Sequence, residues 1–120
     1  GDPAAYAAFV KEEVQTGLRG VTKQALKNVI IAYEPIWAIG SDEVDTPERT
    51  LEMALYIRKI VADLYDRSIA QIFPVLYGGS ANAHNARAFL QDGGIDGLLI
   101  GRASLDAKEF GKIVEIANEL

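Results

Sequence analysis

Apolar residues fall along the chain in two alternating patterns, short continuous runs and longer stretches with helical spacing. The continuous runs occupy residues 29–33, 72–77 and 97–100, and the first of them is rich in β-branched residues. Runs of this kind are typical of strands buried on both faces of a sheet. Pro74 is awkward inside a central strand because it removes a ladder hydrogen bond, so a shorter second strand over residues 74–77 is the alternative.

Helical spacing marks the stretches between these runs. The strongest start signal is Thr46-Pro47-Glu48, which combines an N-cap residue, a proline for the first turn and an acid beside the positive helix end. Asp2 and Pro3 predict a helix start in the same way, and Gly17 ends or weakens that first helix. The residues expected to face the core are Tyr6, Phe9, Val10 and Val14 in the first helix; Met53, Tyr56, Ile57, Ile60, Val61 and Leu64 in the second; Ala86, Phe89 and Leu90 in a helix over residues 82–90; and Phe110, Ile113, Val114 and Ala117 in a helix over residues 107–120.

Strands and helices therefore alternate, in the order helix, strand, helix, strand, helix, strand, helix. Short connections in this order imply a parallel sheet with right-handed crossovers, which is the α/β class. The 120 residues contain neither a linker nor a low-complexity tract, so we expect a single domain over residues 1–120.

Composition and charge narrow the classes of function. The net charge is -5, and lysine and arginine form no cluster. This argues against a nucleic-acid groove and against binding to an anionic membrane, while a small anionic substrate held by backbone amides stays open. The chain has no cysteine, which excludes disulfides and thiol chemistry and favours a cytoplasmic protein.

The chain ends and the apolar runs bear on targeting. No apolar run reaches the roughly 18 residues that span a bilayer. The start, Gly1-Asp2-Pro3-Ala4, does not resemble a secretory signal, and it lacks an initiator methionine. We therefore expect a processed or excised piece of a longer protein.

Candidate chemistry gathers where the predicted strands end. Glu34 closes the first strand, and Pro35 biases it toward an extended backbone. The apolar loop after it suits a lid that buries its side chains on closing. Gly78 and Gly79 follow the second strand and Gly101 the third, and glycines let backbone N–H groups approach a phosphate closely.

Each of these residues also has a structural interpretation. Glu34 is either a general base beside a bound phosphate or a strand-end carboxylate paired with a local cation, and the residues alone do not decide. Gly78 and Gly79 could form only a turn. His84, the single histidine, is expected at the surface, and without a second histidine or a cysteine the sequence predicts no metal site.

Three segments carry a resemblance to a known family. They are residues 32–40 (Ala-Tyr-Glu-Pro-Ile-Trp-Ala-Ile-Gly), residues 77–80 (Tyr-Gly-Gly-Ser) and residues 101–105 (Gly-Arg-Ala-Ser-Leu). Together they strongly resemble triosephosphate isomerase, and the first segment is highly specific to that family. The resemblance runs from Asp2 to Leu120. It implies a partial (β/α) barrel, the TIM barrel, in which this chain would supply the last three strand–helix units and the helix before them, out of eight strands and about 250 residues.

The resemblance also implies roles for individual residues. Glu34 matches the base that moves a proton between adjacent carbons of a triose phosphate, in an isomerase of glycolysis and gluconeogenesis that uses no cofactor and no metal. The phosphate-binding positions are Gly40, Ser80, Gly101 and Arg102. The lid and its latch are Pro35, Ile36, Trp37, Ala38, Ile39 and Tyr77.

Several residues depart from the family pattern. The lid usually continues as Thr-Gly-Lys-Thr-Ala, whereas this chain has Ser41-Asp42-Glu43-Val44-Asp45. Arg102 stands where a second glycine is usual. The family's asparagine, lysine and electrophilic histidine belong to the other half of the barrel, and His84 does not match that histidine.

Three hypotheses follow. The chain is the C-terminal half of a triosephosphate isomerase that needs its N-terminal half for activity and has little or none alone. Alternatively, it is a non-catalytic half-barrel module that self-associates to cover its open strand edges. A phosphate-binding barrel enzyme of another chemistry is the third. The expected partners are therefore a triose phosphate and either the N-terminal half or a second copy, with no nucleic acid and no membrane.

Overall fold

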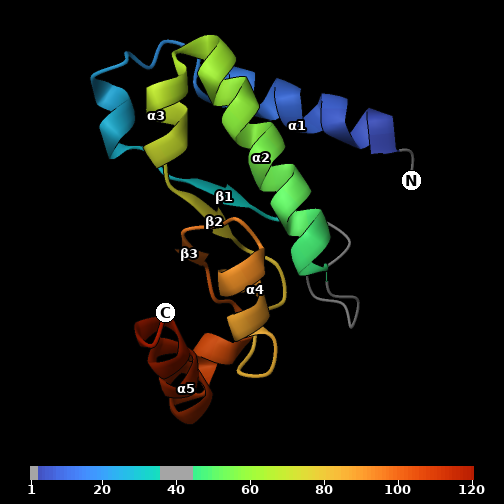
Figure 1. Cartoon of the computed structure of the whole chain (residues 1–120), viewed down its shortest axis with the longest axis vertical. Coiled ribbons are helices and arrows are strands. Elements are labelled where there is room, and N and C mark those ends of the chain that lie inside the picture. The colour runs from blue at the N-terminus through green and yellow to red at the C-terminus, as the bar shows by residue number, and fades with distance from the viewer. Residues whose placement is uncertain (1–2, 36–44) are drawn as a thin grey trace. The chain divides into compact units, whose positions relative to one another are not determined.

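The computed structural model describes residues 3–35 and 45–120 of the chain, which form an α/β fold with parallel strands alternating with helices (Figure 1). The elements, in chain order, are the α-helices and strands α1 (Pro3–Gly17), β1 (Ile31–Tyr33), α2 (Pro47–Leu64), α3 (Arg67–Ile72), β2 (Val75–Tyr77), α4 (Ala86–Asp92), β3 (Gly97–Leu98) and α5 (Ala107–Asn118), with the 3-10 helices η1 (Ala25–Asn28) and η3 (Arg102–Leu105) between them.

The three strands form one open parallel sheet in the order β1-β2-β3. In the register, Tyr33 lies opposite Tyr77, and Tyr77 lies opposite Leu98. The predicted parallel sheet and the predicted alternation of strands and helices are therefore confirmed. The open sheet is consistent with part of a TIM barrel.

The chain divides into two compact units. The first comprises residues 1–29 and 55–73, and it contains α1, η1, α3 and the second part of α2. Tyrosine hydroxyls tie its segments together, because Tyr56 donates to the carbonyl of Ala7 at 3.1 Å and Tyr65 donates to the carbonyl of Val21 at 2.6 Å. Its buried apolar residues are Val10, Val14, Leu18, Leu26, Ile57, Ile60, Val61, Ala70 and Phe73.

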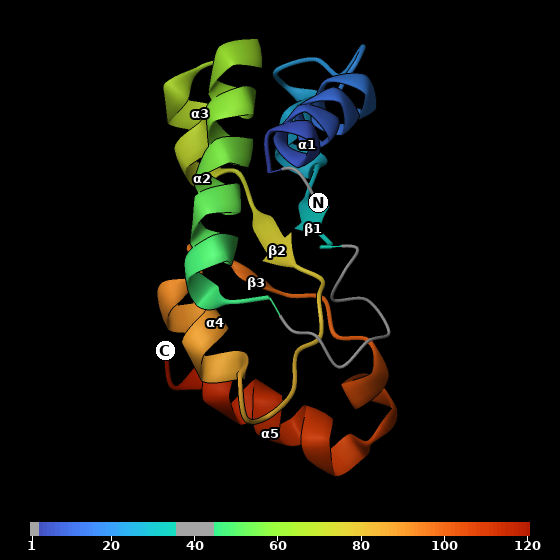
Figure 2. The same cartoon turned by 90° about the vertical axis from the view of Figure 1, so that its right-hand side faces the viewer.

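The second unit comprises residues 30–54 and 74–120 and holds the sheet, the first turns of α2, and α4 and α5. Tyr77 stacks on Phe89 at its centre, with ring centroids 4.3 Å apart. Helices α4 and α5 lie side by side in both views (Figure 2), and an ion pair between Arg87 and Glu119 joins them. The buried apolar residues here are Tyr33, Ala54, Val75, Tyr77, Ala86, Phe89, Ile95, Ile113 and Ile116.

The predicted starts of the first two helices agree with the structure. Helix α2 begins at Pro47, and the Thr46 hydroxyl accepts a hydrogen bond from the Arg49 N–H at 3.1 Å, as an N-cap does. Helix α1 begins at Pro3, which was predicted to lie in its first turn, and ends at Gly17, which was predicted to end or weaken it.

The second strand is shorter than residues 72–77. Ile72 ends helix α3 with 82% of its surface exposed, and β2 starts only at Val75. Asp66 starts this unpredicted helix by accepting hydrogen bonds from the Ile69 N–H and the Ser68 hydroxyl. Pro74 therefore precedes the strand, as its missing N–H requires.

The first and third strands also differ from the prediction. Strand β1 covers residues 31–33, and burial on both faces was wrong for it because Ile30 is 60% exposed and Ala32 is also exposed. Strand β3 covers only residues 97–98. In the described sheet, β1 is an edge strand and pairs only with β2.

Some predicted inward positions of the helices were wrong. Phe9 and Leu64, which were predicted to face the core, are exposed. The start of α4 also differs, because this helix begins at Ala86 rather than at residue 82. In α5, Ile113 is buried as predicted, but Phe110, Val114 and Ala117 are exposed, and Ile116 is buried instead.

Candidate functional site

The carboxyl ends of the three strands meet at one edge of the sheet. The Gly78 N–H donates to the carbonyl of Tyr33 at 2.7 Å, and the Leu99 N–H donates to the carbonyl of Tyr77 at 2.9 Å. These bonds continue the parallel register one residue past each strand. Glu34, Gly78 and Leu99 therefore leave the sheet side by side, at the edge where α/β folds place their chemistry.

The side chain of Glu34 lies directly against the backbone of Gly78. A Cβ atom added to Gly78 would come within 2.6 Å of Glu34 Cγ and 3.2 Å of Glu34 Oε1. The backbone of Gly78 does not have a positive φ. Glycine is thus required here for close approach, and it sets the position of an exposed carboxylate.

Tyr77 is buried beneath this edge, and its phenol folds back against Gly79, where a Cβ atom would overlap the hydroxyl. Among the described residues, nothing forms a hydrogen bond of normal geometry with this hydroxyl. Burial and, to a smaller extent, the negative charge of Asp45 raise the pKa of Tyr77 to about 12, although the main chain of Asp45 partly opposes both effects.

Asp45 is a buried acid that the sequence patterns did not single out. Its carboxylate accepts hydrogen bonds from the Thr50 hydroxyl at 3.1 Å, the Thr46 N–H at 3.0 Å and the Tyr33 hydroxyl at 3.5 Å, and it pairs with Arg49. Its position directly before the helix start at Thr46 was the one available signal, since an acid is favourable there.

The loop after β2 is held by side chains from its own residues and from α5. The Asn82 and Asn85 side chains cap each other's backbone N–H groups at 3.0 Å and 2.8 Å, and the Asn85 amide donates to the carbonyl of Ser80 at 3.2 Å. The Glu109 carboxylate accepts from the Ala83 N–H at 2.8 Å. This contact, between residues far apart in the chain, has no sequence signal. His84 is exposed, as expected.

Gly101 and Arg102 lie past the end of β3 and are both exposed. The carbonyl of Gly101 accepts from the Ser104 N–H at 2.9 Å and from the Ser104 hydroxyl at 2.6 Å, which starts the 3-10 turn η3. A Cβ atom on Gly101 would meet open space. Gly101 and Arg102 are thus accessible to solvent, and no neighbouring side chain or backbone fills the space beside Gly101.

The remaining predicted site residues are part of the apolar loop after Glu34. Pro35 is fully buried. The structure does not describe the others, which are Ile36, Trp37, Ala38, Ile39 and Gly40. In the described part of the chain, no group of three or more acidic, histidine or cysteine side chains could hold a metal ion, and no helix has the length and apolar character to cross a membrane.

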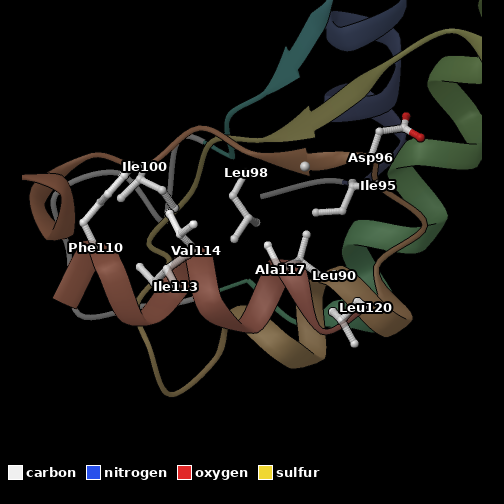
Figure 3. Close-up of a pocket in the computed structure, with 11 residues that line it drawn as sticks. Leu90, Ile95, Asp96, Leu98, Ile100, Phe110, Ile113, Val114, Ala117 and Leu120 are labelled. Carbon is white, nitrogen blue, oxygen red and sulfur yellow. The ribbon is translucent and has the colours of Figure 1, made fainter. Parts of the chain in front are cut away.

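A cavity of about 380 Å³ lies on the α5 side of β3 (Figure 3). Side chains from both elements point into it, and its lining is almost entirely apolar. The residues that line it include Leu98, Ile100, Phe110, Val114 and Ala117. The one carboxylate beside it, Asp96, accepts a hydrogen bond from the Val75 N–H at 2.8 Å. The cavity therefore lacks the free polar groups that a phosphate site needs.

Known proteins resemble the whole chain. The model of the triosephosphate isomerase family matches residues 2–117. The chain is 45% identical to the triosephosphate isomerase of Ruthia magnifica over 106 residues, and 42% identical to that of Geotalea uraniireducens over 108 residues. These alignments cover 88% and 90% of this chain but only 42% and 43% of the relatives, so the chain spans about two fifths of their length. With a family match over almost all of its residues, this chain belongs to the triosephosphate isomerase family.

Proposed function

We propose that this chain supplies the general base and most of the phosphate-binding loops of a triosephosphate isomerase, which interconverts dihydroxyacetone phosphate and glyceraldehyde 3-phosphate. The observation that carries the proposal is the placement of Glu34. Its carboxylate is exposed at the carboxyl end of β1 and lies along Gly78, the first residue of the loop after β2. Family membership supports the choice of substrate.

The proposed chemistry needs one carboxylate and no cofactor. Glu34 removes a proton from the hydroxyl-bearing carbon beside the carbonyl group and returns it to the former carbonyl carbon. A second proton passes from the hydroxyl oxygen to the former carbonyl oxygen, so the carbonyl and hydroxyl groups exchange places. A carboxylate is a suitable base when it is held within hydrogen-bond reach of that proton. The contact with Gly78 limits where the carboxylate can lie, so it supports this role.

The substrate phosphate would bind to backbone N–H groups near Ser80, Gly101 and Arg102. The Asn85 side chain holds the carbonyl of Ser80, which stabilises the loop from outside. Exposed Arg102 adds a positive charge beside a dianion. By family resemblance, Gly40 adds a further amide. Pro35, Ile36, Trp37, Ala38 and Ile39 form the lid, and Tyr77 latches it.

The proposed active species contains the rest of the barrel. The chain spans about two fifths of its relatives' length, and stabilisation of the negative charge that develops on the substrate oxygen is usually the largest contribution to rate. The groups expected to provide it lie outside this chain. We therefore propose an N-terminal half-barrel as the partner, and little or no turnover by the chain alone.

The test is complementation. The chain is co-expressed with the N-terminal portion of one of the relatives, and turnover of dihydroxyacetone phosphate is measured. Glu34→Gln should lower kcat by about a thousandfold, because a positioned base typically contributes a factor of this order. Glu115→Gln, which makes the same substitution at an exposed position of α5, is the matched control. Absence of turnover above background, or equal rates for Glu34→Gln and the unmodified chain, would refute the proposal.

A second candidate is a non-catalytic module that self-associates. In the described sheet, β1 and β3 each pair on one side only, and Leu105 is 88% exposed. Unpaired strand edges and exposed apolar side chains favour association with another chain. Sedimentation equilibrium of the chain alone tests this candidate, and a stable, well-folded monomer would count against it.

A further inference from the structure

Asp45 is far more buried than a surface loop acid would be. Its side chain is completely inaccessible to solvent. A buried carboxylate persists only where donors replace the water it has lost. The Thr50 hydroxyl, the Thr46 N–H and the Arg49 guanidinium group, whose Nε lies 3.3 Å from Asp45 Oδ1, provide that replacement.

These contacts attach Asp45 to the first turn of α2. Thr46 caps that turn, and Thr50, which is fully buried, lies one turn further along. The carboxylate has a second neighbour outside the helix.

That neighbour is Tyr33, the last residue of β1. Its hydroxyl lies 3.5 Å from Asp45 Oδ2, to which it donates a long hydrogen bond, while its carbonyl accepts from the Gly78 N–H at 2.7 Å. Tyr33 is therefore held at its side chain by Asp45 and at its backbone by β2. The next residue is Glu34, whose carboxylate lies against the same Gly78.

We propose that Asp45 is a positioning residue of the candidate active site, which acts through the Tyr33 hydroxyl to fix the end of β1 and with it Glu34. Its contacts with α2 give it a rigid support, so the strand end is held to the start of a helix as well as to β2. The effect on turnover rests on the proposed function, whereas the effect on the strand end does not.

Backbone hydrogen exchange of the 120-residue chain tests the positioning directly. The Ile31 N–H donates to the carbonyl of Pro74 at the start of the β1–β2 ladder, and the Gly78 N–H donates to Tyr33 at its end. A loss of overall stability changes the exchange of both amides by the same factor. Release of the strand end alone changes only Gly78.

In Asp45→Ala and in Tyr33→Phe, we expect the Gly78 amide to exchange about tenfold faster relative to Ile31, which corresponds to about 1.4 kcal/mol of lost local stability. The double variant should add nothing further, because both changes break one connection. Asp45→Asn keeps an acceptor oxygen and should restore part of the protection, and it also serves if Asp45→Ala folds poorly.

Asp66→Ala is the matched control. Asp66 also accepts hydrogen bonds at a helix start, but it belongs to the other unit. It should leave the ratio of the Gly78 and Ile31 exchange rates unchanged. If Asp45→Ala and Tyr33→Phe also leave this ratio unchanged, the proposal is overturned.

In the complemented enzyme, Asp45→Ala should lower kcat by about tenfold to a hundredfold while KM stays within about twofold, because a displaced base affects the chemical step more than binding. The kcat of Asp45→Asn should lie between that of Asp45→Ala and that of the unmodified enzyme. An unmodified enzyme without turnover would contradict the proposed function, and the exchange ratio would still decide the role of Asp45. A kcat unchanged by Asp45→Ala in an active enzyme would overturn its role in catalysis.

Discussion

At the scale of single residues, the contact between Glu34 and Gly78 should affect catalytic activity strongly and the stability of the fold very little. In Gly78→Ala, the new methyl group would lie within 2.6 Å of Glu34 Cγ, so the carboxylate must move. Glu34 is exposed and flexible enough to do so, and the backbone of Gly78 has no positive φ that alanine would strain. We expect kcat of the complemented enzyme to fall about a hundredfold, with the urea midpoint of the chain nearly unchanged.

Gly17→Ala provides the control for this substitution. A Cβ atom at Gly17 would meet nothing within 4 Å, and the residue lies at the end of α1 in the other unit. Its kcat should equal that of the unmodified chain. A Gly78→Ala enzyme with full activity would show that the position of Glu34 does not depend on this contact.

Tyr77 should make stability fall at high pH. Its pKa rises from an ordinary value of about 10 in the unfolded chain to about 12 in the folded one, mainly because the phenol is buried. Below pH 10 the phenol is protonated in both states and contributes no pH dependence. Between about pH 10 and 12 only the unfolded chain ionises, so the free energy of unfolding decreases.

Urea titrations from pH 9 to 12 measure this decrease. In Tyr77→Phe, the part of the decrease that is caused by ionisation of Tyr77 should be absent. Phenylalanine keeps the stacking on Phe89 and removes a buried hydroxyl that has no partner among the described residues. We therefore expect Tyr77→Phe to be at least as stable as the unmodified chain at pH 8. Identical pH profiles for the two chains would contradict the interpretation of the phenol as the titrating group.

The position of Glu34 could be predicted from the sequence, because a β-branched run, a terminal carboxylate and a following proline together indicate the end of a strand, although β1 is less buried than the run suggests. Asp45 could not. Its acceptor role depends on Tyr33, twelve residues earlier, and on Thr50, five residues later. Neither separation belongs to a periodic pattern, so only the folded chain shows that these side chains meet.

At the scale of elements, local capping signals were reliable and strand boundaries were not. Helix α2 begins where Thr46 and Pro47 predict. Helix α3 was missed because its six residues are too short for helical periodicity to be visible, and Ile72 looked like part of the apolar run that leads into β2. The Asp66 side chain, which starts this helix, was the available signal.

Helix α5 contains a glycine that can be replaced with a gain in stability. Gly111 is exposed inside the helix, and an added Cβ atom would meet nothing within 4 Å. Gly111→Ala should raise the free energy of unfolding by about 0.5–1 kcal/mol, because alanine restricts the unfolded chain and suits a helix better. A urea midpoint that rises while the slope stays constant would confirm this.

Gly94→Ala is the opposite case in the same unit. Gly94 has a φ of +67°, and an added Cβ atom would lie 2.5 Å from Leu51 Cδ1. Backbone strain and steric overlap should together lower the free energy of unfolding by about 1 kcal/mol or more. Equal effects of the two glycine substitutions would show that the backbone of these segments is not as described.

At the scale of the whole molecule, an open three-stranded sheet leaves apolar side chains uncovered. In the unit that holds the sheet, Phe110, Val114 and Ala117 line a cavity beside β3 and are themselves exposed (Figure 3). These apolar residues recur at helical spacing, so we predicted that they face the core. The spacing alone does not reveal whether another element covers that face of the helix. Either proposed partner, an N-terminal half-barrel or a second copy, would cover these exposed side chains.

Val114→Glu tests whether this surface takes part in association. Val114 is 49% exposed, so a glutamate can extend into solvent in the isolated chain without loss of stability. In a complex that covers the residue, the charge would be buried without a partner. We expect the affinity for an N-terminal half-barrel, or for a second copy, to fall at least about tenfold in sedimentation titrations.

Lys112→Glu is the control, because it adds a glutamate on the same helix at a position that does not line the cavity, and it should change the affinity much less. Equal binding by Val114→Glu and the unmodified chain would place the association surface elsewhere, because a buried, unpaired carboxylate at a true contact cannot be energetically neutral.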